Sequence, residues 1–258
     1  MRKRSGTSMK RRGFMGMSAG LAATGMFGGL GVGRARADRK GGYGPLVANA
    51  GPDLMLPHGF HYEIISRYGD VMTDGFPTPL AMDGMGAFAL PNGNVALIRN
   101  HEDRQNPDHF RTFAPPVKDG FLAQRLHTHY GPRGDAYDKY GAAGCTILEV
   151  GRHPHYQVVR HNWAIVGTNV NCAGGVTPWG SWITCEETVA SGSETATTGF
   201  ASNHGYAFEV PLSTLEDGPV TPVPLKFLGR FAHEAVAGEN RNKRSDSLHL
   251  VTSGRTRG

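Results

Sequence analysis

The chain has 258 residues, a formal net charge of +5 and three cysteines. Eight of its 27 basic residues and none of its 22 acidic residues lie within residues 1–37, so residues 38–258 carry a net charge of −3. A basic nucleic-acid-binding patch is therefore not indicated, and the mature length is enough for one large domain or two small ones.

Residues 1–37 have the order of an export signal. The pair Arg11-Arg12 stands directly before an uncharged run, Phe14–Val32, which is followed by the small-x-small site Ala35-Arg36-Ala37. This order predicts a signal peptide of the twin-arginine (Tat) pathway, with the Tat translocase as export partner and a periplasmic or secreted bacterial protein as the product. The alternative is a membrane anchor, because the run approaches the ~20 residues of a span. Its glycines and alanines and the cleavage site favour removal, so we expect no stable anchor.

Short β-strands are expected along the rest of the chain. Runs of strand-forming residues stand at 61–66, 87–90, 95–99, 146–150, 156–166, 181–185, 206–210 and 225–233. The second and third runs flank Pro91-Asn92-Gly93-Asn94, which is typical of a hairpin. Gly and Pro separate the runs and no long apolar stripe has helical spacing, so the pattern favours an all-β sandwich, barrel or propeller. Residues 103–140 are expected to form a long loop.

Carboxylates stand where several of these strands end. The three clusters are Asn100-His101-Glu102-Asp103, Cys185-Glu186-Glu187-Thr188 and His233-Glu234. Neighbouring carboxylates repel each other unless a proton or cation lies between them, so convergent clusters indicate a cation site. Successive strand residues face opposite sides, so only one of Glu186 and Glu187 is expected to enter a shared site. A solvated acidic turn remains the alternative for each cluster.

The segment Asn171-Cys172-Ala173-Gly174-Gly175 is a turn-rich stretch that leads into the strand carrying Glu186. Its glycines let other main-chain segments approach the cysteine closely, as a metal ligand or nucleophile needs. A buried structural thiol bridged to Cys185 is the alternative, and a Cys145–Cys185 pair is also open. With three cysteines, at least one thiol is free or bound to another group. No zinc Cys-x-x-Cys pair, Gly-x-Ser-x-Gly elbow or P-loop is present.

Together these motifs resemble the PhoX family of alkaline phosphatases. The resemblance rests on the twin-arginine leader and on the segments Arg99–Glu102, Asn171–Gly175, Thr177–Trp182, Thr184–Glu187 and Gly229–Ala235. It implies a β-propeller whose axial site binds ferric iron (Fe3+) and calcium (Ca2+) and hydrolyses phosphate monoesters.

The resemblance also implies ligands for these cations. By motif, Cys172 would bind iron, and Glu186, Glu187 and Glu234 would bind iron or calcium, while Glu102 and Asp83 are further candidates.

After Ala237 the sequence departs from this family pattern, which would continue with a Thr-Glu-Asp-type motif and further blades. The expected domains are the signal peptide at 1–37, a partial propeller at 38–237 and a divergent tail, open to disorder, at 238–258. The propeller is therefore expected to be incomplete, with material for about five blades of ~40–45 residues. Two hypotheses remain open: a metal-dependent phosphatase, and an inactive or binding-only remnant that binds calcium or phosphate without turnover. A propeller lactonase would not explain the segment around Cys172.

Overall fold

The structure is a computed structural model that describes residues 42–48, 53–103, 121–152, 154–194, 199–241 and 245–252. The predicted signal peptide at 1–37 lies outside these residues. Within the described part of the chain, no helix combines the length and hydrophobicity that crossing a membrane requires. The chain divides into two compact units, Met1–Tyr62 and Glu63–Gly258, and each is described by itself.

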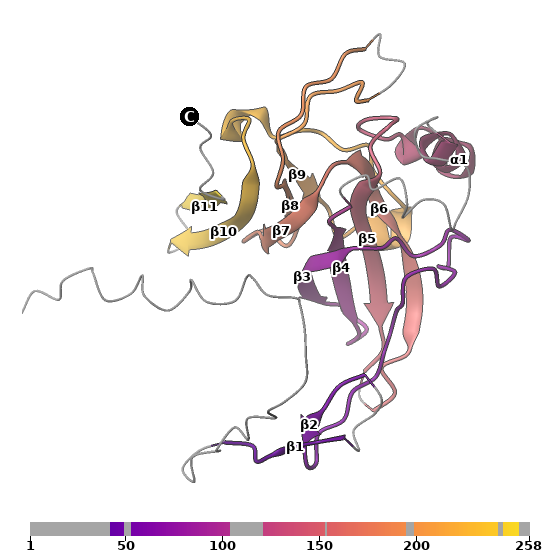
Figure 1. The fold of residues 1–258 in the computed structure, drawn as a ribbon, viewed down its shortest axis with the longest axis vertical. Helices are drawn as coiled ribbons and strands as arrows, with labels where there is room; N and C mark the ends of the chain where they lie inside the picture. The colour runs from indigo at the N-terminus through magenta and orange to yellow at the C-terminus, as the bar shows by residue number, and fades with distance from the viewer. Residues whose placement is uncertain are drawn as a thin grey trace, which may run out of the picture. The chain divides into compact units, whose positions relative to one another are not determined.

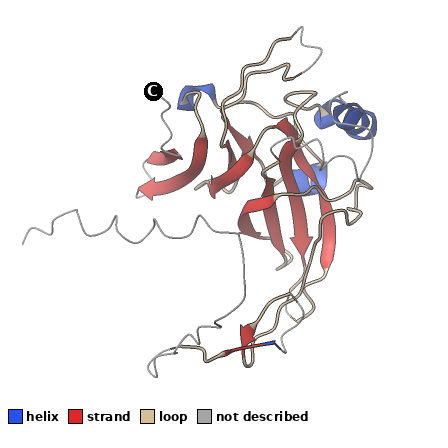
Figure 2. Ribbon diagram, in the orientation of Figure 1, coloured by secondary structure: helices blue, strands red, loops and turns tan. Residues whose placement is uncertain are grey.

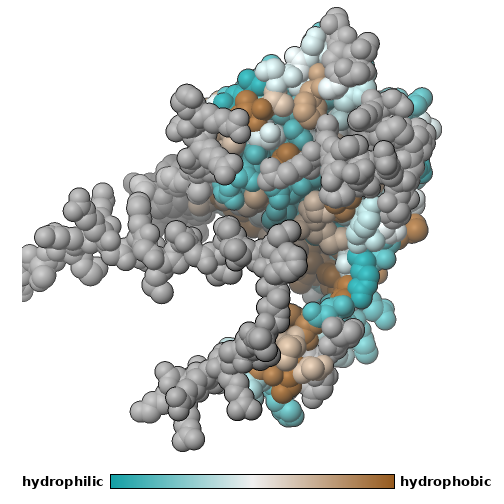
Figure 3. Space-filling model, in the orientation of Figure 1, coloured by the Kyte–Doolittle hydropathy of each residue, from teal (hydrophilic) through white to brown (hydrophobic). Residues whose placement is uncertain are grey.

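The first unit contains one short antiparallel pair, β1 (Leu46–Val47) with β2 (Leu56–Pro57). Five large apolar side chains of this unit are exposed: Tyr43, Leu46, Leu54, Met55 and Phe60. Figure 3 shows hydrophobic colouring in the region of these strands. The predicted strand at 61–66, which begins in this unit, is wrong, because these residues form no strand.

The second unit is built from antiparallel β-strands (Figures 1 and 2). One sheet has the order β3 (Met82–Ala89), β4 (Val95–His101), β5 (Ala143–Val150), β6 (Val158–Thr168). A second has the order β7 (Asn171–Val176), β8 (Trp182–Glu186), β9 (Ala207–Val210), and β10 (His233–Arg241) pairs with β11 (Ser245–Thr252). The all-β prediction is confirmed. None of the sheets in the described residues closes on itself, and the propeller stays a prediction.

The predicted hairpin between β3 and β4 is confirmed. Gly93 has φ 81° and donates its N–H to the carbonyl of Leu90, while Leu90 N–H donates to Asn94. The Asn92 side chain accepts from Asn94 N–H at 2.9 Å. Glycine adopts this left-handed conformation without strain, so the local sequence favours the turn. The side chains of Asn92 and Asn94 also donate to Glu149 of the neighbouring strand.

Three apolar cores separate the layers of the second unit. The largest lies between the two sheets and includes Ile98, Ile147, Ile165, Trp182 and Phe208. Another, with Ile183, Cys185, Ala207 and Val236, lies between the second sheet and β10. Strands β5 and β8 are buried along their whole length because both of their faces are covered. A strand covered on both faces loses the alternation of polar and apolar residues that marks a half-buried one.

A helix lies in the predicted loop at 103–140, of which residues 104–120 are outside the described part. Helix α1 (Phe121–Tyr130) places Leu122, Leu126 and Tyr130 on one face, and these pack with Trp163 of β6. The Tyr130 hydroxyl and the Trp163 N–H both donate to Asp74 Oδ2 at 2.9 Å. Ten residues with three apolar contacts make too short a stripe to stand out in the sequence.

Two of the eight predicted strands are wrong, and five strands, β1, β2, β7, β10 and β11, were not predicted. Instead of a strand at 225–233, the chain forms a 3-10 turn, Lys226–Leu228, that ends at Gly229 with φ 89°. The turn-rich stretch at 171–176 is strand β7. The predicted domain boundary after residue 237 falls inside β10, which pairs with β11 up to Ser245. All three cysteines are free, so neither the Cys172–Cys185 disulfide nor the Cys145–Cys185 disulfide considered above is present.

Candidate metal centre

Three hairpins repeat one arrangement at the same end. In β3–β4, β7–β8 and β10–β11 the first residue of one strand pairs with the last residue of the other: Met82 with His101, Asn171 with Glu186, and His233 with Thr252. The next residue of each first strand is a candidate ligand: Asp83, Cys172 and Glu234. The residue after the second strand is Glu102 in the first hairpin and Glu187 in the second. The sequence repeats no motif at these positions, so this repeat was missed.

Each of these first strands has an irregularity at its candidate ligand. The pairing register shifts between Met82 and Met85, between Asn171 and Gly174, and between His233 and Ala235. A β-bulge interrupts the ladder, bends the strand and redirects a side chain, and such bulges are common beside functional sites. The bulges therefore turn Asp83, Cys172 and Glu234 out of regular pairing at one end of their hairpins.

Strand β7, which pairs with β8, also packs closely against β3 and β10, which flank it in Figure 1. A Cβ on Gly84 of β3 would lie 2.9 Å from the Cα of Ala173. A Cβ on Gly175 would lie 1.9 Å from the carbonyl oxygen of Val236 in β10. A side chain at either position would push the main chains apart. The glycines thus bring the three candidate ligands of these strands together.

Two groups of potential ligand atoms meet at one thiol. The atoms of Asp83, Glu102 and Cys172 lie within 4.8 Å of one another, and so do those of Cys172, Glu187 and Glu234. The Cys172 thiol donates to Glu234 Oε1 at 3.5 Å. The structure therefore brings together all the predicted ligands except Glu186. Asp83 is exposed and the others are half-buried, so the groups are accessible from solvent.

The electrostatics of these groups are those of a cation site. Burial raises the pKa of the Cys172 thiol far above its usual value, and the charges of Asp83, Glu234, Glu187 and Glu102 raise it further. Four carboxylates around one thiol disfavour the thiolate in the absence of a positive charge. A bound metal ion reverses this effect and stabilises the thiolate. The arrangement is thus suited to one or more multivalent cations.

Glu186 does not enter either group, because successive residues at the end of β8 face opposite sides. Its buried carboxylate accepts main-chain N–H bonds from Asn169 at 2.8 Å, Gly205 at 2.6 Å and Tyr206 at 3.0 Å. It also bonds His204 Nδ1 at 2.7 Å. Glu186 thus joins the segment before β7 to the segment before β9. Of the two adjacent glutamates, Glu187 alone belongs to a ligand group in the described residues, as strand alternation leads one to expect.

His204 links Glu186 to a second buried carboxylate, that of Asp138, at 3.3 Å. Burial by itself lowers the pKa of His204, but the hydrogen bonds to Asp138 and Glu186 outweigh it and raise the pKa. For Asp138, burial opposes ionisation, and the bonds from His204, Ser202 N–H and Tyr140 N–H lower the pKa overall. Asp138, His204 and Glu186 thus form a buried hydrogen-bond network at the last residue of β8.

His101 and His233, which stand beside the candidate ligands Glu102 and Glu234, belong to neither ligand group and instead make hydrogen bonds within the fold. His101 bonds the Leu80 carbonyl through Nδ1 and the Thr146 hydroxyl through Nε2, both at 2.9 Å. His233 bonds the Gly229 carbonyl through Nε2 at 3.3 Å. Both side chains are buried. The potential metal ligands of the two groups are therefore one cysteine sulfur and carboxylate oxygens, with no imidazole nitrogen.

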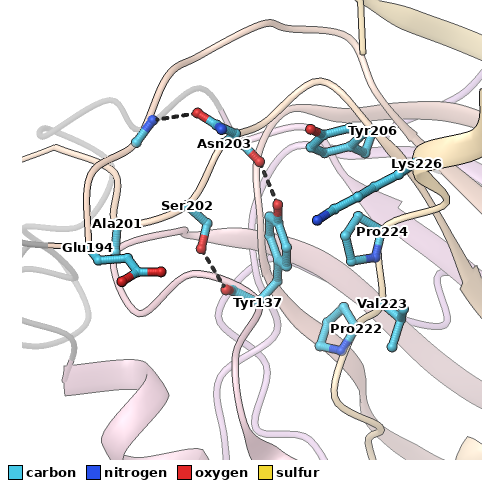
Figure 4. Close-up of a pocket in the computed structure, with 11 residues that line it drawn as sticks. Tyr137, Glu194, Ala201, Ser202, Asn203, Tyr206, Pro222, Val223, Pro224 and Lys226 are labelled. Atoms are coloured by element: carbon cyan, nitrogen blue, oxygen red, sulfur yellow. Dashed lines mark hydrogen bonds between the residues drawn. The ribbon is translucent and has the colours of Figure 1, made fainter. Parts of the chain in front are cut away.

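A separate pocket of about 540 Å³ lies away from these groups (Figure 4). Tyr137, Tyr206, Pro224 and Lys226 form part of its wall, and the Tyr137 hydroxyl donates to the Asn203 carbonyl at 2.5 Å. None of the six predicted ligands lines it. With a single carboxylate, that of Glu194, it does not offer the convergent donors of a metal site.

One comparison with known proteins gave a match. The family model described as "Alkaline phosphatase PhoX" matches residues 41–164 and 155–247. A search of curated proteins and a search of solved structures found no match. The matched range includes all six predicted ligands and extends ten residues past the predicted domain boundary at residue 237.

Proposed function

The chain belongs to the PhoX family of alkaline phosphatases, and we propose that it is a metal-dependent phosphomonoesterase whose centre lies around Cys172. Family membership supports a phosphatase-type function. The observation that carries the metal-dependent reading is the meeting of two ligand groups at the Cys172 thiol.

The donor set fits ferric iron together with calcium. Ferric iron is a hard cation that takes carboxylates and tolerates thiolate, whereas calcium takes oxygen ligands alone. Cys172 would bind iron with carboxylates from both groups, and the remaining carboxylate oxygens would bind calcium. The groups lack imidazole and a second thiol, which makes a zinc site of the usual Cys and His type a poorer fit.

Bound cations would neutralise the phosphoryl oxygens, lower the pKa of a water molecule and offset charge on the leaving oxygen. Hydrolysis of a phosphate monoester has one of the slowest uncatalysed rates, so it needs strong charge stabilisation. The chain's own contribution is to hold its donors in place before substrate binds. The close packing of β7 against β3 at Gly84 and against β10 at Gly175 supports this role.

Export through the Tat pathway is part of the same proposal. Arg11 and Arg12 before the uncharged run support it. The Tat pathway carries folded proteins, so iron and calcium could be bound before export. The proposed location is the periplasm or the medium, and the proposed substrate is a small phosphate ester.

One observation favours a second candidate, a binding-only relative without turnover. In the described residues the first two hairpins each contribute two residues to the ligand groups, whereas the third contributes Glu234 alone. If further donors are required for turnover, calcium or phosphate would bind without hydrolysis.

Metal analysis and turnover on one sample distinguish the two candidates. The full chain is exported through Tat, its iron and calcium are measured by mass spectrometry, and hydrolysis of p-nitrophenyl phosphate is followed. Iron and calcium together with turnover that is lost in Cys172→Ala support the phosphatase. Calcium without turnover supports the binding-only relative. Folded protein that binds neither metal and, in a separate binding measurement, no phosphate contradicts both.

A further inference from the structure

We propose that Asn100 is a positioning residue that holds the main chain at Cys172 and so determines where the thiol lies in the metal centre. This inference rests on the proposed function and adds to it a residue that does not itself bind the metal. Asn100 lies on β4, in a different sheet from Cys172, and its side chain reaches β7 across the core between the sheets.

The Asn100 amide uses its full hydrogen-bonding capacity. Its Nδ2 donates to the carbonyl oxygens of Cys172 and Ala173, both at 2.9 Å. Its Oδ1 accepts from Trp182 Nε1 at 2.9 Å and from the Cys145 thiol at 3.1 Å. Two acceptors on one side and two donors on the other admit only this orientation of the amide. Asn100 is fully buried, so a lost bond would not be replaced by bulk water.

The bulge in β7 explains why these two carbonyls need an outside partner. The ladder between β7 and β8 runs from the pair Asn171–Glu186 to the pair Gly174–Thr184. Cys172 and Ala173 therefore stand together opposite Cys185 and leave the regular pairing. A buried main-chain carbonyl without a partner costs free energy, and Asn100 supplies that partner to both residues. The main chain of the bulge at Cys172 is thus hydrogen-bonded by the side chain of Asn100, which belongs to another sheet.

The same strand also leads to Glu102, a candidate ligand that shares a group with Cys172. Asn100 is the second-last residue of β4, and Glu102 directly follows the strand. Asn100 holds the main chain of Cys172, and Glu102 shares a ligand group with the Cys172 thiol. A shift of Asn100 would therefore change the separation of Glu102 and Cys172. Residues that orient metal ligands in this way commonly affect metal affinity about 10–100-fold.

The test compares Asn100→Asp with Cys145→Ala in the full, metal-loaded chain. Asn100→Asp preserves the shape and the acceptor toward Trp182 but replaces the donor to Cys172 and Ala173 by an oxygen. Cys145→Ala removes one partner from the other side of Asn100 and leaves both donors in place. We expect iron affinity to fall about 10–100-fold in Asn100→Asp, with a shift or loss of the visible thiolate-to-iron charge-transfer band. In Cys145→Ala the band and the iron content should match wild type, whatever the change in melting temperature.

A second readout does not depend on metal. In metal-free protein the rate at which iodoacetamide alkylates Cys172 is measured by peptide mass spectrometry, and a released main chain should raise it several-fold in Asn100→Asp alone. If wild type contains no iron, the metal proposal fails and this rate still decides the role of Asn100. An unchanged band and iron content in Asn100→Asp would overturn the positioning role, as would equal alkylation rates in iron-free protein.

Discussion

The Cys172 thiol lies 3.5 Å from Glu234 Oε1 and donates a hydrogen bond to it, although the two residues are 62 positions apart in the chain. The contact joins β7 to β10 at the ends where both strands are bulged. As a thiol, Cys172 is a partner for the carboxylate; as a thiolate it would repel Glu234. A cation between them removes that repulsion, so metal binding and loss of the thiol proton are expected to occur together.

Replacing the thiol tests the centre most directly. Cys172→Ala is expected to lose bound iron and to reduce p-nitrophenyl phosphate hydrolysis by more than about 100-fold, because a direct ligand contributes more than the residues that orient it. The fold should remain, since the side chain is small and half-buried. Metal mass spectrometry and circular dichroism check both. Cys185→Ala is the matched control, because Cys185 lies in an apolar core; iron loss in this control would contradict the assignment.

The adjacent glutamates are expected to respond in opposite ways. Glu187→Gln removes one negative charge from the site, so it should weaken metal binding while the metal-free protein becomes more resistant to urea. Glu186→Gln leaves His204 with one carboxylate partner fewer in a buried network and should lower the free energy of unfolding by about 3 kcal/mol. Urea titrations of metal-free and metal-loaded protein measure both effects. Equal stability losses in the two variants would argue against separate roles.

Metal removal should destabilise the protein in a salt-dependent way. Without cations, the carboxylates around Cys172 repel one another, so a chelator is expected to lower the melting temperature. Added sodium chloride should restore part of the loss, because mobile ions screen exposed charges over about 10 Å at 0.1 M. Differential scanning calorimetry with EDTA, across a salt series, tests this. A melting temperature that EDTA leaves unchanged would count against a structural contribution from the metal.

Acid should destabilise the fold through His161. Burial lowers its pKa to about 3, with a further decrease from the neighbouring Arg99 charge. The unfolded chain therefore binds a proton below pH ~6.5 that the folded chain does not, and stability falls as pH decreases. Between pH 7 and pH 5 this amounts to about 2 kcal/mol for one such histidine.

The check is urea unfolding of His161→Gln against wild type at both pH values. Between pH 7 and pH 5, the free energy of unfolding of His161→Gln should fall by about 2 kcal/mol less than that of wild type. His127→Gln is the control, because His127 lies on the solvent side of α1 with its side chain 58% exposed. A His161→Gln variant with the wild-type pH dependence would show that another group is responsible.

Much of the fold could be predicted from local sequence. The β3–β4 hairpin was predicted because Asn92 and Gly93 favour the turn whatever surrounds them. Strand alternation also predicted that Glu186 and Glu187 face opposite sides and that only one of them enters a shared site. Helix α1 and the strand character of 171–176 were missed, because the first is short and the second is rich in glycine. The role of Gly174 and Gly175 lies in their close contacts with the carbonyl groups of Ile183 and Val236.

The sequence by itself determined the residue types of the candidate centre: a cysteine among glycines, and carboxylates at strand ends. It did not determine which of them meet. That depends on bulges at Asp83, Cys172 and Glu234, on close approach of β3, β7 and β10, and on the bonds from Asn100 to β7. The close approaches and the Asn100 bonds join residues 61 to 89 positions apart, and no local propensity records such contacts. Only tertiary packing brings the donors within reach of one cation.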